Sequence, residues 1–117
     1  MAKLAELWTS SAPERDTIVI DGKEFEVKSL DDLSFDDQLV IARNARVAEM
    51  ATMPNSNITG KQLRDALITI AKTLLLDNEK KELVPTLESM KDMALVQLFN
   101  AFLDGATFKA LQQRSTS

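Results

Sequence analysis

The chain of 117 residues is long enough for one modest hydrophobic core, and its 44% hydrophobic and 27% charged residues are ordinary for a globular domain. The balance of 14 Lys and Arg against 18 Asp and Glu gives a formal net charge of -4, which disfavours binding to nucleic acid or to anionic lipid. Because the chain has no Cys and no His, it lacks disulfides, thiolate nucleophiles, the usual general base and the commonest metal ligands, so we expect no enzyme.

The first 15 residues combine a short amphipathic turn with a linker. Leu4, Leu7 and Trp8 recur at the spacing i, i+3 and i+4, and Thr-Ser-Ser-Ala-Pro follows them. We predict a flexible segment over residues 1–15, with the alternative that Trp8, the only Trp of the chain, anchors another chain. No apolar run here or later approaches the roughly 18 residues that span a bilayer, so we expect a soluble protein without a membrane partner.

The next segment alternates in polarity on both sides of Asp21-Gly22, which predicts a β-hairpin with a two-residue turn. In the predicted register Ile18 lies opposite Phe25, and four apolar side chains share one face: Ile18, Ile20, Phe25 and Val27. A lone hairpin is marginally stable in water. We therefore expect helices to cover its apolar face, or another chain to extend one of its two open edges.

Two predicted helices follow, and each begins with the spacing of a capping box. Ser34 with Asp37 starts the first, which should end near Thr52 because Pro54 follows. Thr59 with Gln62 starts the second, which should end near residue 77. The expected apolar side of the first helix comprises Phe35, Leu39, Ala42, Val47, Met50 and Ala51, and that of the second comprises Leu63, Ala66, Leu67, Ile70, Ala71 and Leu74.

After a connection over residues 79–85, a third helix is predicted from a cap at Ser89 to a stop at Gly105. Its expected packing side comprises Met90, Met93, Ala94, Gln97, Leu98, Ala101 and Phe102. The helix is apolar nearly all round, so it is either central in the fold or presents a surplus face to a partner. The candidate partner-binding residues are Trp8, Leu95, Leu98, Phe99 and Phe102.

These elements predict a mainly α fold in which an N-terminal β-hairpin precedes a body of three or four helices. We divide the chain into a flexible segment (1–15), a single hairpin-plus-helices domain (16–105), and a short turn with a loose tail (106–117). Phe108 and Leu111 supply that last turn.

The polar residues predict no catalytic, cofactor-binding or metal-binding site. The most conspicuous cluster comprises Asp31, Asp32, Asp36 and Asp37, which lack the alternating ligands and the glycine of a calcium loop. Carboxylates in the first turn of a helix are stabilised by the helix dipole, so we interpret the cluster as a helix start. The three glycines are too far apart for a phosphate-binding loop, and no serine lies in a G-x-S-x-G motif.

The order of these elements resembles the tail assembly chaperones of long-tailed bacteriophages. The stretch "IVIDGKEFEVKSL" followed by "DDLSFDDQLVIA" is similar to that family's opening pattern, which is matched here by Asp21, Gly22, Lys23, Glu24, Phe25, Val27 and Leu30. The segment "MKDMALVQLFNAFLDG" resembles the family's last amphipathic helix. The resemblance covers residues 17–105 and carries over no functional residue.

The resemblance implies a non-enzymatic protein that coats the long, mostly helical tape measure protein and helps to recruit tail tube protein. Such a protein acts in the cytoplasm of the infected host cell and is absent from the mature virion. Self-association remains open at this stage. The alternatives are a structural virion component, such as a connector or tail-completion subunit whose hairpin joins sheets in a ring, and a small enzyme.

Overall fold

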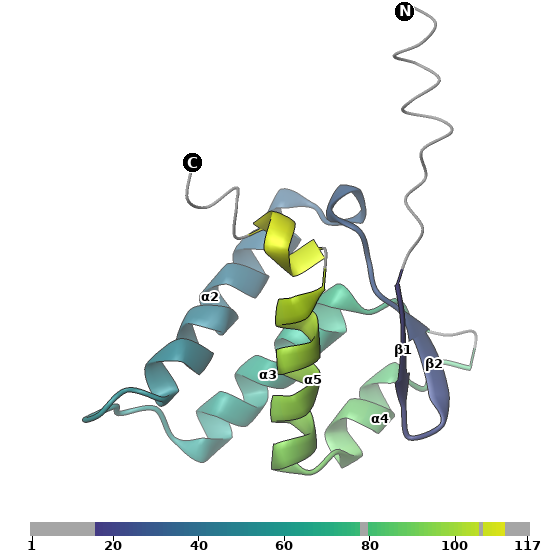
Figure 1. Ribbon diagram of the computed structural model, residues 1–117. Coiled ribbons are helices and arrows are strands. Elements are labelled where there is room, and N and C mark those ends of the chain that lie inside the picture. Colours follow the sequence, from purple (N-terminus) through teal and green to yellow (C-terminus); the bar gives the residue numbers. More distant parts are fainter. Residues whose placement is uncertain (1–15, 78–79, 106, 112–117) are drawn as a thin grey trace, which may run out of the picture.

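The computed structural model describes residues 16–77, 80–105 and 107–111 and has the predicted architecture of a hairpin followed by helices (Figure 1). Its elements are the strands β1 (Thr17–Ile20) and β2 (Lys23–Glu26), the 3-10 turn η1 (Leu30–Asp32), and the helices α2 (Phe35–Ala51), α3 (Gly60–Leu74), α4 (Leu83–Ser89) and α5 (Asp92–Asp104). A further helical turn covers residues 107–111. The predicted flexible segment over 1–15 lies outside the described residues.

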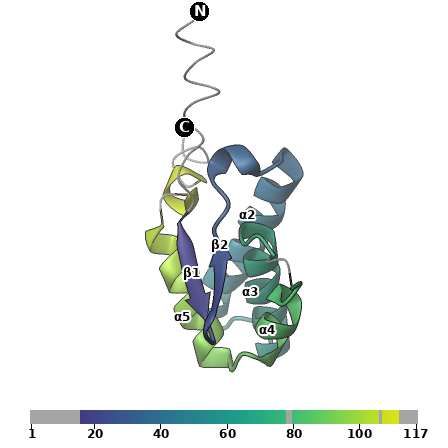
Figure 2. The same ribbon diagram turned by 90° about the vertical axis from the view of Figure 1, so that its right-hand side faces the viewer.

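The hairpin has the predicted register, with Ile18 paired to Phe25 across the antiparallel strands. Asp21 and Gly22 both have positive φ, of 54° and 76°, as the two central residues of a type I′ turn require. Phe25 is 1% exposed, and the predicted apolar face of the hairpin packs on the core. Figure 2 shows the hairpin in front of the helices, with α5 beside β1 and α4 beside β2.

The prediction that both edges of the hairpin are open was wrong for β2. The Lys28 amide donates a hydrogen bond to the Leu74 carbonyl (2.7 Å), and the Leu76 amide donates one to the Glu26 carbonyl (2.9 Å). Residues 74–76 therefore run beside the continuation of β2, and α3 ends three residues earlier than predicted because Leu75 adopts an extended conformation there. The outer edge of β1 has no paired strand within the described residues.

The capping boxes were predicted correctly. The Asp37 amide donates to Ser34 Oγ (3.0 Å) at the start of α2, and the Gln62 amide donates to Thr59 Oγ1 (3.1 Å) at the start of α3. A third box was not predicted: the Ser29 amide donates to Asp32 Oδ2 (2.9 Å) at η1. The Ser34 amide in turn donates to Asp37 Oδ2 (3.2 Å), so Asp32 and Asp37 both accept local hydrogen bonds at helix starts, in agreement with the interpretation of the acid cluster.

Helix α4 was missed because Pro85 and the charges before it suggested a connection. Pro85 stands in the first turn of α4, where its missing N–H has no intrahelical acceptor to lose. Asp77 accepts a hydrogen bond from the Leu83 amide (3.0 Å) and so satisfies one of the free donors at that helix start. Ser89 is consequently the last residue of α4, and Lys91 is the N-cap of α5.

The core lies between α3, the hairpin and α5, and it includes the C-terminal turn. On α3 both Ile70 and Ala71 are fully buried. Phe108, 5% exposed, packs edge-to-face on Phe99 with 5.9 Å between ring centroids, and Thr107 Oγ1 donates to the Lys28 carbonyl (2.8 Å). The predicted turn at Phe108 is therefore part of the domain, whose described core extends past the predicted boundary at 105.

Candidate partner-binding groove

Helix α2 carries large apolar side chains on its outer side. Phe35 is 77% exposed and Leu39 is 51% exposed, whereas the inward-facing Ile41 and Ala48 are buried. The predicted apolar side of this helix is therefore not its packing side. The helix carries two apolar stripes, and the one with small alanines packs inward, where it lets a neighbouring helix approach closely.

The outer stripe of α2 forms one wall of a groove of about 710 Å³. Phe35, Leu39 and Ala42 contribute to this wall, and Phe108 and Leu111 from the C-terminal turn contribute to the opposite side. The groove also contains one charge of each sign, because Arg46 and Glu49 line its part nearest the end of α2. The groove thus combines an apolar interior with a few polar groups.

This arrangement suits an amphipathic helix. Phe35, Leu39, Ala42 and Arg46 follow one another at helical spacing along α2, so they form a continuous ridge. A partner helix with an apolar stripe can lie along such a ridge and leave its polar face in water.

Within the described residues, no group of three or more Asp or Glu side chains is placed to hold a metal ion.

Most of the partner-binding candidates predicted on the third helix are buried in the core and form no accessible surface. Leu95, Leu98 and Phe102 on α5 are 1%, 7% and 4% exposed, so their prediction as partner-binding residues was wrong, whereas the prediction that Leu98 and Phe102 pack was correct. They pack inward because α5 lies against α3 and the hairpin, and the outer side of α5 carries exposed Met93 instead. Met93, Gln97 and Ala101 were all predicted to pack, and that prediction was wrong because all three are exposed.

Phe99 is half-buried and supports the groove indirectly, because its ring packs on Phe108, a residue of the groove wall. Trp8, the remaining candidate, lies outside the described residues. The groove therefore combines α2 with the C-terminal turn, and these two segments are more than 50 residues apart in sequence.

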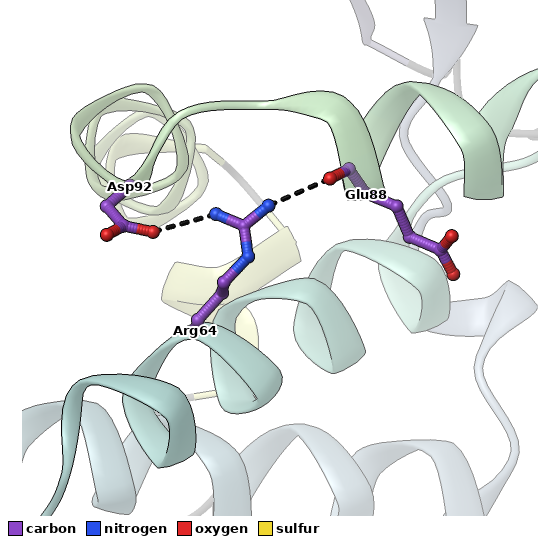
Figure 3. Close-up of polar contacts among 3 residues, drawn as sticks. All are labelled: Arg64, Glu88 and Asp92. Atoms are coloured by element: carbon purple, nitrogen blue, oxygen red, sulfur yellow. Dashed lines mark hydrogen bonds and ion pairs between the residues drawn. The ribbon is translucent and has the colours of Figure 1, made fainter.

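A polar contact of Arg64 joins three helices and has a structural role. Arg64 on α3 donates from Nη1 to Asp92 Oδ1 (2.7 Å) and from Nη2 to the Glu88 carbonyl (2.9 Å), as Figure 3 shows. The guanidinium thus joins the end of α4 and the start of α5 to α3. The Asp92 carboxylate is 83% exposed, so the ion pair is in contact with solvent.

The structure is thus a small helical domain with an N-terminal hairpin and an exposed apolar groove between α2 and the 107–111 turn. Comparison of the chain with protein-family models, with curated proteins and with solved structures finds no match. In the described part of the chain, no helix combines the length and apolar character that are needed to cross a bilayer.

Proposed function

We propose that this protein is a non-enzymatic tail assembly chaperone that binds the tape measure protein of a long-tailed bacteriophage and promotes assembly of the tail tube. The observation that carries the proposal is the exposed apolar ridge of Phe35 and Leu39, which faces Phe108 across an open groove. A mostly helical client offers the amphipathic helices that such a groove accepts. The resemblance of residues 17–105 to the chaperone family supports the same assignment.

The small apolar area of the ridge predicts weak binding at each groove, which suits many separate contacts along one long client. Burial of an exposed Leu or Phe side chain contributes roughly 1.5–3 kcal/mol, and Phe35 and Leu39 are exposed by 77% and 51%. Part of that gain is lost to the ordering of both partners, so one groove binds one helix weakly. Several copies can bind successive segments of one long client, and the weakness of each contact allows each copy to be released separately.

The competing assignment is a structural connector or tail-completion subunit of the virion. The outer edge of β1, which no strand of the described residues pairs with, favours it, because an unpaired strand can add to a sheet of another subunit. Mass spectrometry of purified particles separates the two assignments. A chaperone acts in the host cytoplasm and is absent from the mature virion, whereas a connector gives a stoichiometric signal, which would overturn the proposal.

The direct test measures binding to helical segments of the tape measure protein encoded in the same genome. Leu39→Asp places a charge in the middle of the apolar ridge and should weaken binding at least about tenfold, since a desolvated charge costs more than the roughly 1.4 kcal/mol that this factor represents. Met93→Asp is the matched control, because Met93 is 68% exposed on α5 and does not line the groove. Equal binding by both folded variants would exclude the groove as the client site.

A further inference from the structure

The exposed residues of α2 repeat at the spacing of a helix that pairs with another helix. Five of them alternate by four and three residues, as in a heptad repeat, and all five line the groove: Phe35, Leu39, Ala42, Arg46 and Glu49. This repeat keeps one seam of a helix in contact with a partner helix over several turns. Scattered exposed apolar residues, which are common on protein surfaces, do not have this order. The seam therefore indicates a helix as the occupant of the groove.

The residues of the seam fit a second copy of α2 that runs antiparallel. At the centre of such a pair, Leu39 of each copy meets Ala42 of the other, so a large side chain packs on a small one. In the same register, Arg46 of each copy lies over the ring of Phe35 of the other, and a guanidinium and an aromatic ring attract each other. A parallel pair would instead place Arg46 against Arg46 and Glu49 against Glu49, which are like charges.

The charges that flank the seam select the same register. Asp36 and Arg43 are exposed, and neither lines the groove, so they lie on the other side of the seam. In the antiparallel pair Asp36 of each copy lies beside Arg43 of the other, which gives two ion pairs. A shift by one heptad would bring Arg43 beside Arg43 or Asp36 beside Asp36. Charge complementarity therefore favours a second copy of this chain as the occupant.

The position of the C-terminal turn is compatible with this pair. Figures 1 and 2 place the 107–111 turn at the same end of the molecule as the beginning of α2. In an antiparallel pair the two turns therefore lie at opposite ends, and Phe108 and Leu111 of each copy face the last turns of α2 of the other. Met50 at that end of α2 is 46% exposed, so it is accessible to a partner.

We propose that two copies of this chain associate through α2, antiparallel and in the register that pairs Asp36 with Arg43, so that each copy covers the groove of the other. The apolar area at the seam is small, so the dimer is weak and dissociates on dilution. The association itself does not rest on the function proposed above. Under that function, a client helix competes with the second copy for the groove.

Sedimentation equilibrium of the full chain tests the dimer without any client, because the mean mass should rise from one chain to two as the concentration increases. Leu39→Asp should raise the dissociation constant at least about tenfold, since it places a charge against Ala42 of the other copy. Met93→Asp should leave it unchanged, because Met93 is exposed on α5 and does not line the groove. A chain that stays monomeric up to its solubility limit, or a dimer that Leu39→Asp does not weaken, would overturn the proposal.

Exchange of charges tests the register. Asp36→Arg and Arg43→Asp each turn two opposite-charge contacts into like-charge contacts, so each variant alone should dimerise at least about fivefold more weakly. An equimolar mixture of the two variants restores both opposite-charge contacts, and its dissociation constant should return close to that of the unchanged chain. This recovery also requires that both variants are folded.

The matched control for the exchange is a mixture of Asp65→Arg with Arg43→Asp. Asp65→Arg makes the same change of charge at an exposed site of α3 outside the groove, so this mixture should show no recovery. Recovery in the control mixture as well would mean that net charge alone governs the association. That result, or no recovery with Asp36→Arg, would overturn the proposed pairing.

Addition of a tape measure helix separates this proposal from the proposed function. A client that binds the groove should convert the dimer into complexes of one chain with one client helix, because both occupants use the same seam. A dimer that passes the charge exchange and binds no client supports the association and overturns the function. A chain that binds the client and is monomeric at every concentration overturns the association and leaves the function intact.

Discussion

The outer face of α2 and the inner face of α5 are both apolar, but one is exposed and the other is buried. Phe35 and Leu39 on α2 are mostly exposed, whereas Leu95 and Leu98 on α5 are buried. The difference arises from what lies beside each helix: α5 is enclosed by α3 and the hairpin, while α2 meets α3 only through its alanine-rich side. An apolar helix face therefore becomes core or exposed surface according to its neighbours in space.

The largest expected effect on the free energy of unfolding comes from shortening a buried side chain of α5. Leu95→Ala should lower the free energy of unfolding by about 3 kcal/mol, because it removes buried methyl groups and leaves a cavity beside Leu67 and Ala48. The matched change Leu39→Ala on α2 should cost less than about 0.5 kcal/mol, since its side chain is half exposed. Urea denaturation of both variants gives the two values, and equal losses would contradict the assignment of the two faces.

A smaller effect is expected from the polar contact that holds the start of α5. Arg64→Met should lower the free energy of unfolding by about 1 kcal/mol, because the Glu88 carbonyl loses its charged donor along with the ion pair. Asp92→Asn removes only the solvent-exposed ion pair and should cost less than about 0.5 kcal/mol. Thermal unfolding of both variants checks the order, and a larger loss for Asp92→Asn would mean that the ion pair dominates the contact.

Local features of the fold could be predicted, because their causes lie within a few residues of one another. The turn at Asp21 and Gly22 determines the hairpin register, and Thr59 with Gln62 satisfies the first amides of α3 three residues apart. The prediction at Pro85 was wrong for the same reason. A proline is compatible with the first turn of a helix but breaks a helix further on, and the local sequence did not show that α4 begins at Leu83.

Features that depend on distant partners could not be predicted. No residue near Leu75 in the sequence indicates that α3 ends before it and that Leu75 pairs with Val27. Val27 precedes α2 in the sequence, so the whole of α2 separates the two residues along the chain. The groove has the same origin, because Phe108 and Leu111, which line it opposite Phe35, come from the other end of the domain. The spacing of Phe35, Leu39 and Ala42 did indicate an apolar stripe, but the sequence alone does not tell a stripe that packs from one that stays exposed.

The smallest effect on stability is expected at the outermost residue of the ridge, where the effect on binding should be clear. Phe35→Ser should change the free energy of unfolding by no more than about 0.5 kcal/mol, because Phe35 is 77% exposed and loses little contact with the fold. Under the proposed function, it should weaken binding of a tape measure helix by several fold, since the apolar area that Phe35 would bury in that complex is lost. Denaturation and calorimetric titration on the same preparation measure both quantities. A variant that loses stability and keeps full binding would show that Phe35 serves the fold, and the contrast between α2 and α5 would then fail at its clearest position.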